Sequence, residues 1–256
     1  MTAEPVFLVS TGRTGTRFLA EVFAKYGRAV ASHHTTTFTR PLNILNNLVA
    51  LGVLPRALPN AWADRLLIPR ISTAQDRWIE CNPYYAGSVA LLRRRFPGAY
   101  FVMVVRHPQA FCNSHLRWER QRLASRIANQ LIPAWAPISF HEQLLGLMQN
   151  ENQRIRYYAK VWSTRNEIIL NGLSDHRRSR ILRFEDIFDR DMGGQAITNL
   201  FDWLRLPVVS YPINIAPGDK PNRTVSASHI EWNDRRRQLI YRHCGSLMLR
   251  LGYEVY

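Results

Sequence analysis

The chain is poor in cysteine. Its 256 residues contain three, Cys81, Cys112 and Cys244, and no two of them have the close spacing that is typical of a zinc site. Their scattered positions and odd number also argue against a disulfide framework. The sequence therefore fits a reducing compartment, and we expect a cytoplasmic protein.

The sequence also lacks a long hydrophobic run. The longest apolar stretch, residues 42–54, is interrupted by three asparagines and a glycine, so it is too short and too polar to span a bilayer. The chain enters a predicted strand within a few residues of its start, without the basic and apolar segments of a secretory signal. We expect neither a transmembrane segment nor a secretory signal.

Acidic residues are scarce. The chain has 19 Asp and Glu against 34 Lys and Arg, which gives a formal net charge of +15. Such a surface favours an anionic partner: a phosphorylated cofactor, an acidic polymer, nucleic acid or the surface of an anionic membrane. A basic soluble enzyme from an arginine-rich genome would have the same composition. The length and the 46% hydrophobic content predict a single domain over residues 1–256.

Short apolar runs alternate with segments of helical periodicity. This order predicts an α/β fold of three layers, in which helices cover both faces of a central parallel sheet. The predicted strands are residues 6–10, 28–32, 77–80, 100–105 and 180–184. The predicted helices are residues 16–26, 41–54, 84–96, 109–122, 140–148, 155–170, 197–204 and 229–251. Prolines predict an irregular segment or broken helix over residues 55–69 and a loop over residues 206–226.

The first predicted strand leads into the sequence Ser-Thr-Gly-Arg-Thr-Gly-Thr-Arg at residues 10–17. A strand, a glycine turn and a helix start present backbone N–H groups to a phosphate. This turn is P-loop-like, but it departs from the Walker A pattern. Thr16 stands where the lysine is required, Arg17 where the metal-binding hydroxyl is required, and Ser10 replaces the first glycine. The turn therefore predicts binding of an anion that needs neither that lysine nor a metal.

A second motif follows the fourth predicted strand, Val-Val-Arg-His-Pro-Gln-Ala-Phe-Cys-Asn-Ser at residues 104–114. Together the two segments resemble the signatures of sulfotransferases that use 3′-phosphoadenosine 5′-phosphosulfate (PAPS). The first resembles their 5′-phosphosulfate loop. The second resembles their 3′-phosphate motif, in which a serine follows the arginine by eight positions, as Ser114 follows Arg106. Residues 181–186 and 251–253 resemble further segments of the family.

The resemblance implies how PAPS would be held. The backbone amides of the turn and the helix dipole would bind its 5′ end, and Arg106 would bind its 3′-phosphate bidentately, with Ser114 adding a hydroxyl. The residues implied for the 5′ end are Arg13, Thr14, Gly15, Thr16 and Arg17. Phe184 would lie near the adenine, with core packing as the alternative, and Arg223 in a basic loop would reach the 3′-phosphate. We expect no metal, because a sulfuryl group carries less charge than a γ-phosphoryl.

The family resemblance also implies the catalytic groups of an in-line displacement. Arg13 would stabilise the leaving phosphate by charge alone, because an arginine does not give up its proton. His34 is the favoured base, since an imidazole titrates near neutral pH, and His33 is the alternate. Glu80 is a second candidate for the base, with a cap or a salt bridge as its alternative role.

These features predict a sulfotransferase that moves a sulfuryl group from PAPS to a hydroxyl of a carbohydrate, lipid or small metabolite, leaving 3′-phosphoadenosine 5′-phosphate. One alternative is a P-loop kinase or NTPase, which Thr16 in the lysine position argues against. The other is a basic polyanion-binding protein. Such a protein would have a basic stripe with interleaved aromatics, whereas the arginines here are spread over many helices, so we expect no nucleic-acid partner. The net charge permits peripheral contact with an anionic membrane. The acceptor and the oligomeric state stay open.

Overall fold

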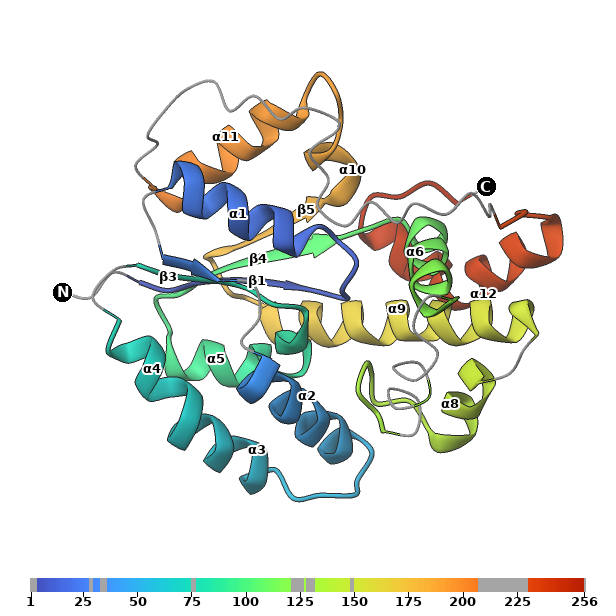
Figure 1. The fold of residues 1–256 in the computed structure, drawn as a ribbon, viewed down its shortest axis with the longest axis horizontal. Helices are drawn as coiled ribbons and strands as arrows, with labels where there is room; N and C mark the ends of the chain where they lie inside the picture. The colour runs from blue at the N-terminus through green and yellow to red at the C-terminus, as the bar shows by residue number, and fades with distance from the viewer. Residues whose placement is uncertain are drawn as a thin grey trace.

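The computed structural model describes residues 4–27, 30–32, 36–74, 77–120, 127, 132–147, 150–206 and 230–255. A five-stranded sheet lies at its centre, with every neighbouring pair parallel and the order β2-β3-β1-β4-β5 (Figure 1). The strands are β1 (Val6–Ser10), β2 (Val30–Ser32), β3 (Trp78–Cys81), β4 (Tyr100–Val105) and β5 (Ser179–Arg183).

Both faces of the sheet are covered by helices. Along β1, Val6 and Leu8 point into one core, whereas Phe7 and Val9 point into the other, and all four are fully buried. The first core is closed by α1 (Thr16–Tyr26) and α11 (Gly193–Leu204). The second is closed by α5 (Val89–Arg95), α9 (Glu151–Leu173) and α12 (Asp234–Arg250). Figure 1 shows these layers above and below the sheet, and the predicted three-layer α/β fold is confirmed.

The remaining helices flank these layers. They are α2 (Thr36–Ala50), α3 (Ala57–Trp62), a π-helical turn (Ala63–Leu67), α4 (Ile68–Ser72), a 3₁₀ helix (Pro83–Ser88), α6 (Pro108–Arg120), α8 (Phe140–Leu147) and α10 (Phe184–Ile187). No helix among these described residues is both long and apolar enough to cross a membrane.

Several predicted boundaries were wrong. The helices expected from residues 155 and 197 begin four residues earlier, at Glu151 and Gly193. The helix expected from residue 41 begins at Thr36, because α2 accommodates Pro41 within it. The helix expected over residues 84–96 is divided into a 3₁₀ helix and α5, since the Asn82 side chain accepts a hydrogen bond from Tyr84 N and starts the tighter turn. The last helix begins at Asp234, where the side chain of Asn233 caps it. The loop predicted over residues 206–226 lies almost wholly outside the described residues.

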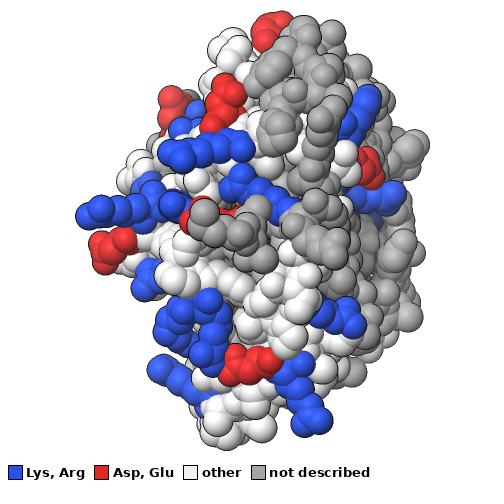
Figure 2. Space-filling view, turned by 90° about the vertical axis from the view of Figure 1, so that its left-hand side faces the viewer, with Lys and Arg blue, Asp and Glu red and all other residues white. Residues whose placement is uncertain are grey.

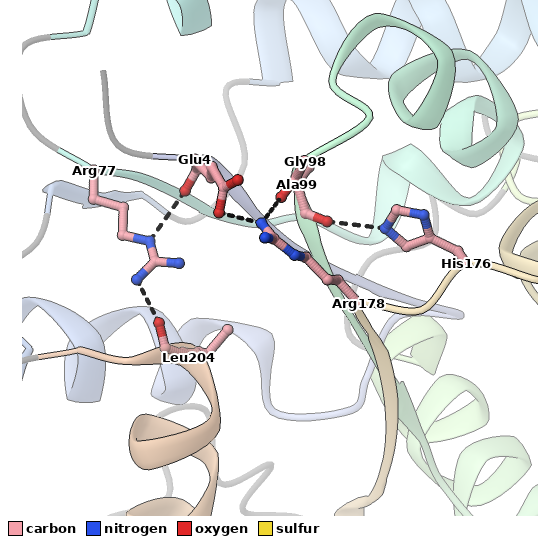
Figure 3. A network of polar contacts seen from close by, with 7 residues as sticks. All are labelled: Glu4, Arg77, Gly98, Ala99, His176, Arg178 and Leu204. Atoms are coloured by element: carbon pink, nitrogen blue, oxygen red, sulfur yellow. Dashed lines mark hydrogen bonds and ion pairs between the residues drawn. The ribbon is translucent and has the colours of Figure 1, made fainter. Parts of the chain in front are cut away.

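A polar network fixes the amino ends of the strands (Figure 3). Glu4, just before β1, accepts a hydrogen bond at its backbone oxygen from Arg77 Nε at 3.0 Å, and its carboxylate pairs with Arg178. Arg178 Nη1 also donates to Gly98 O at 2.7 Å, and Arg77 Nη1 donates to Leu204 O. The segments that precede β1, β3, β4 and β5 are thereby joined. The carboxyl ends of these parallel strands meet at the opposite edge, where ligands of such sheets bind.

Candidate functional site

The turn between β1 and α1, residues 10–15, lies at that carboxyl edge. Three of its residues have left-handed backbone: Gly12 (φ 89°), Arg13 (φ 57°) and Gly15 (φ 77°). Gly12 N donates to Ser10 Oγ at 3.1 Å, which tightens the turn. Gly15 is the N-cap of α1 and provides no side-chain cap, and the first turn of α1 contains no acid. The turn therefore leaves the amides at the positive end of α1 available to an anion.

Thr14 adds a hydroxyl to this turn. Its side chain is fully buried, and Oγ1 has no hydrogen-bond partner among the described residues. Buried hydroxyl groups in native proteins almost always have a partner. An unsatisfied hydroxyl beside a helix N-terminus therefore fits an anionic group that accepts a hydrogen bond from it.

The second motif meets this turn in space. Arg106 directly follows β4, and Ser114 lies on α6. Arg13 Nε donates to Ser114 Oγ at 3.0 Å, and Arg106 Nη1 donates to Arg13 O at 2.9 Å. Trp162 Nε1 in turn donates to Arg106 O at 2.8 Å, which holds the end of β4 against α9. The two motifs predicted to bind opposite ends of one ligand are thus joined by a chain of hydrogen bonds.

Phe184 lies between the two motifs. The guanidinium carbon of Arg106 is 4.1 Å from the centre of the Phe184 ring, which is a cation–π contact. A Cβ placed on Gly15 would lie 3.4 Å from Phe184 Cε2 and 2.7 Å from Phe188 Cε2. Phe184 therefore orients Arg106 and covers Gly15 with Phe188. Its predicted contact with adenine stays a prediction.

Arg106 has little negative charge around it. Burial lowers the pKa of Arg106 to about 10, so the group is still charged at neutral pH. Within the described residues, no carboxylate is within ion-pair distance of it. The charge of Glu185 raises the pKa of Arg106, and the Glu185 oxygens accept hydrogen bonds from His107 N at 3.0 Å and Tyr253 OH at 2.9 Å. The site therefore has an excess of positive charge.

Arg17 and Thr16 occupy the first turn of α1. The Arg17 side chain is 54% exposed, and its Nε lies 3.0 Å from Glu21 Oε1 one helical turn further on. Thr16 is buried. The backbone amides of both residues belong to the first turn, where no intrahelical acceptor exists. Their predicted role as amide donors stays a prediction, and the Arg17 side chain points along α1.

Glu80 lies at the carboxyl end of β3 and is fully buried. Its carboxylate accepts hydrogen bonds from Ser32 Oγ at 2.8 Å and from Asn82 Nδ2 at 2.9 Å. These contacts join the ends of β2 and β3, which favours the structural alternative over the role of base. His33, His34 and Arg223 lie outside the described residues.

Sequence reasoning missed Arg165, which is 1% exposed on α9. Its Nη2 donates to Ser10 O at 3.3 Å and to Pro83 O. The helical spacing of the residues around Arg165 indicated that it is buried. Tyr158, Trp162, Arg165 and Ile169 recur every three or four residues, and all four are buried, so Arg165 lies on the apolar face of α9.

His115 was also missed. Its ring is fully buried, 4.4 Å from the ring centre of Phe111 and 4.6 Å from that of Tyr158. Burial lowers its pKa well below the usual 6.5, and the charges of Arg13, Arg165 and Arg106 lower it further. The imidazole is therefore neutral at physiological pH, and three guanidinium groups are close enough to act on it.

Replacing His115 with phenylalanine is expected to flatten the pH dependence of stability below about pH 6.5. Because the pKa of His115 is lower in the folded chain than in the unfolded chain, the unfolded chain takes up the proton first. The parent protein should therefore lose stability as the pH falls below about 6.5, by up to roughly 1.4 kcal/mol per pH unit. Urea unfolding across this range measures the slopes.

The comparison contains its own control. Burial also lowers the pKa values of His107 and His243, but both residues are present in the parent and the variant, so their effects cancel. The two stability curves should run parallel above about pH 7 and diverge below it. Curves that stay parallel at low pH would contradict the assignment of a depressed pKa to His115.

Comparison with known proteins gives a fold relationship. No family model matches the sequence, and no curated protein matches it significantly. Among solved structures, the sulfotransferase domain from the curacin biosynthetic pathway superimposes with a TM-score of 0.57 at 18% identity, over 100% of this chain and 99% of that one. A sulfotransferase from Alicyclobacillus acidocaldarius superimposes with a TM-score of 0.54 at 12% identity, over 99% and 98%. Identities this low establish a shared fold alone.

Proposed function

We propose that this protein, which has the fold of sulfotransferases, is itself a sulfotransferase that uses PAPS as its donor and a hydroxyl group as its acceptor. One observation carries the proposal. The β1–α1 turn and the motif after β4 meet through the hydrogen bonds of Arg13 with Ser114 and of Arg106 with Arg13. Two anion-binding motifs joined at the carboxyl edge of a parallel sheet suit a donor with phosphate groups at both ends.

The residues at the site fit such a donor. The amides of the first turn of α1 and the Thr14 hydroxyl would hold its 5′ end, and Arg106 with Ser114 would hold its 3′-phosphate. Two observations support the fit: Thr14 Oγ1 and Arg106 Nε are buried, and neither has a hydrogen-bond partner within the described part of the chain. Bound there, PAPS would supply the sulfuryl group.

The side chains suggest how the reaction is assisted. Arg13, oriented by its hydrogen bond to Ser114, would hold positive charge beside the phosphate that is left behind. It stays protonated throughout, so the hydroxyl proton of the acceptor needs a separate base. We assign that role to His34, with His33 as the alternate. The two hydrogen bonds that Glu80 accepts support a structural role for it instead.

Two measurements test the proposal together. The protein is incubated with labelled PAPS and a panel of hydroxyl acceptors (carbohydrates, lipids and small metabolites), and products are screened by mass for the gain of a sulfuryl group. Calorimetric titration with 3′-phosphoadenosine 5′-phosphate tests the donor site independently of the acceptor. Absence of binding would refute the proposal, and a Mg²⁺-dependent ATPase activity would favour a P-loop kinase or NTPase.

Replacing Thr14 with valine is expected to weaken the binding of 3′-phosphoadenosine 5′-phosphate by about tenfold, because a hydrogen bond to a charged group is lost. Valine has nearly the shape of threonine, and Thr14 Oγ1 has no partner to lose among the described residues, so stability should not fall. Titration calorimetry and thermal unfolding measure the two effects.

Thr39→Val is the matched control. Thr39 is also fully buried, but its Oγ1 accepts a hydrogen bond from Asn82 Nδ2 at 3.0 Å. This variant should therefore lose stability and keep its affinity for 3′-phosphoadenosine 5′-phosphate (the bisphosphate). If Thr14→Val bound the bisphosphate as tightly as the parent, the Thr14 hydroxyl would not belong to the donor site.

The distribution of charge bears on the alternative of a polyanion-binding protein. On the face shown in Figure 2, lysine and arginine side chains form several separate groups, with acidic side chains between them. A nucleic-acid-binding surface would instead combine a continuous basic stripe with exposed aromatic residues. Among the described residues of this face, the arrangement of charge therefore favours the enzyme over the polyanion-binding protein. Steeply salt-dependent DNA binding would reverse that preference.

A further inference from the structure

Arg165 is a charged side chain in a position where charge is costly. It is 1% exposed and lies among the largest fully buried side chains of the protein. Arginine is almost never fully buried in proteins unless it is paired. Within the described residues, no carboxylate is within ion-pair distance of Arg165, and neither Nε nor Nη1 has a hydrogen-bond partner.

Burial also lowers the pKa of Arg165 to about 10, so the guanidinium keeps its charge at neutral pH. Arg178 at the amino edge of the sheet is different, because it is paired with Glu4 (Figure 3). An unpaired buried charge destabilises a fold, and an apolar residue of similar size would be more stable there. The position therefore calls for a functional explanation.

The contacts of Arg165 all lie at the carboxyl edge of the sheet. Its two hydrogen-bond acceptors are Ser10 O, where β1 ends and the β1–α1 turn begins, and Pro83 O, just beyond β3. Its guanidinium carbon lies 5.6 Å from the ring centre of Trp135. A Cβ placed on Gly12 would lie 3.5 Å from Trp135 Cζ3, so Trp135 also covers the turn. One side chain thus fixes where the turn starts.

The charge of Arg165 acts on the same side chain, His115, as the charges of Arg13 and Arg106. The neutral ring of His115, next to Ser114 on α6, is influenced by Arg13, Arg165 and Arg106. Its ring centre lies 5.2 Å from that of Trp135, which contacts Arg165. Arg165 is thus linked through Trp135 and His115 to the part of α6 where Ser114 contacts Arg13, and Arg106 in turn contacts Arg13. Like charges brought together in this way are stabilised by a ligand with several negative charges.

We infer that Arg165 is a positioning residue for the donor. Its hydrogen bonds to Ser10 O and Pro83 O fix the start of the β1–α1 turn, and its guanidinium adds a third positive charge to the site. This inference rests on the proposed function, because it takes a polyanionic donor as the ligand. It accounts for both unusual features of Arg165: its hydrogen bonds to Ser10 and Pro83, and its lack of a counter-ion among the described residues. It also explains why the chain keeps a charge there at a cost in stability.

Arg165→Gln and Arg165→Met test the inference, with Arg165→Lys as the variant that keeps the charge. Affinity for 3′-phosphoadenosine 5′-phosphate is measured by calorimetry, stability by thermal unfolding, and kcat and KM for PAPS by turnover. We expect the neutral variants to bind the bisphosphate roughly tenfold to a hundredfold more weakly, with KM rising to match, and Arg165→Lys to be intermediate. Their melting temperatures should equal or exceed that of the parent, because the removed cost of burying the charge outweighs the loss of the hydrogen bonds to Ser10 O and Pro83 O.

Arg156→Gln is the matched control. Arg156 lies on the same helix, and its substitution removes the same charge. Unlike Arg165, it lies outside the site and is paired with Glu142, with 3.2 Å between Arg156 Nη2 and Glu142 Oε1. Its affinity for the bisphosphate should equal that of the parent. If the neutral variants at position 165 melted lower and still bound like the parent, or failed to fold, Arg165 would be structural and the inference overturned. If the parent itself did not bind, the proposed function and this inference would both fall.

Discussion

Replacing Arg106 with alanine is expected to weaken the binding of 3′-phosphoadenosine 5′-phosphate by about a hundredfold, or roughly 2.7 kcal/mol. The guanidinium is charged and largely buried, and Phe184 and the backbone oxygen of Arg13 hold it in place. The Arg106 side chain has therefore already lost its conformational entropy before the ligand binds, so most of the hydrogen-bond energy contributes to affinity. Titration calorimetry measures the change directly.

Two further variants separate charge from geometry. Arg106→Lys keeps the positive charge but lacks the planar fork and the stacking on Phe184, so its affinity should fall by about tenfold. Arg180→Ala removes the same charge from β5, where Arg180 Nη1 donates to Asn199 O at the surface, and its affinity should be unchanged. If Arg180→Ala weakened binding as much as Arg106→Ala, the effect would be one of net charge, and the proposed phosphate contact would be wrong.

Gly15→Ala should lower the free energy of unfolding by about 3 kcal/mol and abolish measurable binding of the bisphosphate. Two costs add. The left-handed backbone at φ 77° is unfavourable for alanine, and the new Cβ would lie 2.7 Å from Phe188 Cε2 and 3.0 Å from Phe188 Cζ. Relief of that contact must move either the ring or the turn, and movement of the turn displaces the amides at the start of α1. Urea unfolding and calorimetry report the two losses.

Gly52→Ala isolates the backbone cost. Gly52 has a similar φ of 74°, but a Cβ there would meet no atom within 4 Å. Its substitution should lower stability by about 1 kcal/mol and leave binding intact. Equal destabilisation by the two substitutions would mean that Phe188 moves aside without cost, and the packing of α10 against the turn would then contribute little to the site.

Much of the fold follows from the sequence because its central elements are determined locally. β1 and β4 are apolar runs with both faces buried, and α1 has a clear apolar stripe that ends at Gly27, so all three have the predicted bounds. The start of α2 was wrong because Pro41 is typical of a first helical turn, yet the packing of the helix accommodates it further in. Boundaries of this kind depend on tertiary contacts.

The candidate site divides in the same way. Arg106 and Ser114 could be found because their spacing resembles the 3′-phosphate motif of PAPS-dependent sulfotransferases, and both lie against Arg13. Arg165 and His115 could not be found that way. Within the described residues, Arg165 is buried without a counter-ion and His115 without a hydrogen-bond partner, and both conditions depend on how α6 and α9 pack around Trp135. Residue type and spacing alone do not reveal them.

Arg13 has a long side chain and a left-handed backbone, at φ 57°, a conformation that glycine or asparagine adopts at a lower energy. Laboratory evolution that selected for heat resistance alone would therefore gain by replacing it, just as it would gain by neutralising Arg165. Variants stabilised in this way would lose the proposed binding of the donor at the turn before they lost the fold. Directed-evolution libraries that aim for a more stable variant should accordingly hold these two codons fixed and diversify the rest of the chain.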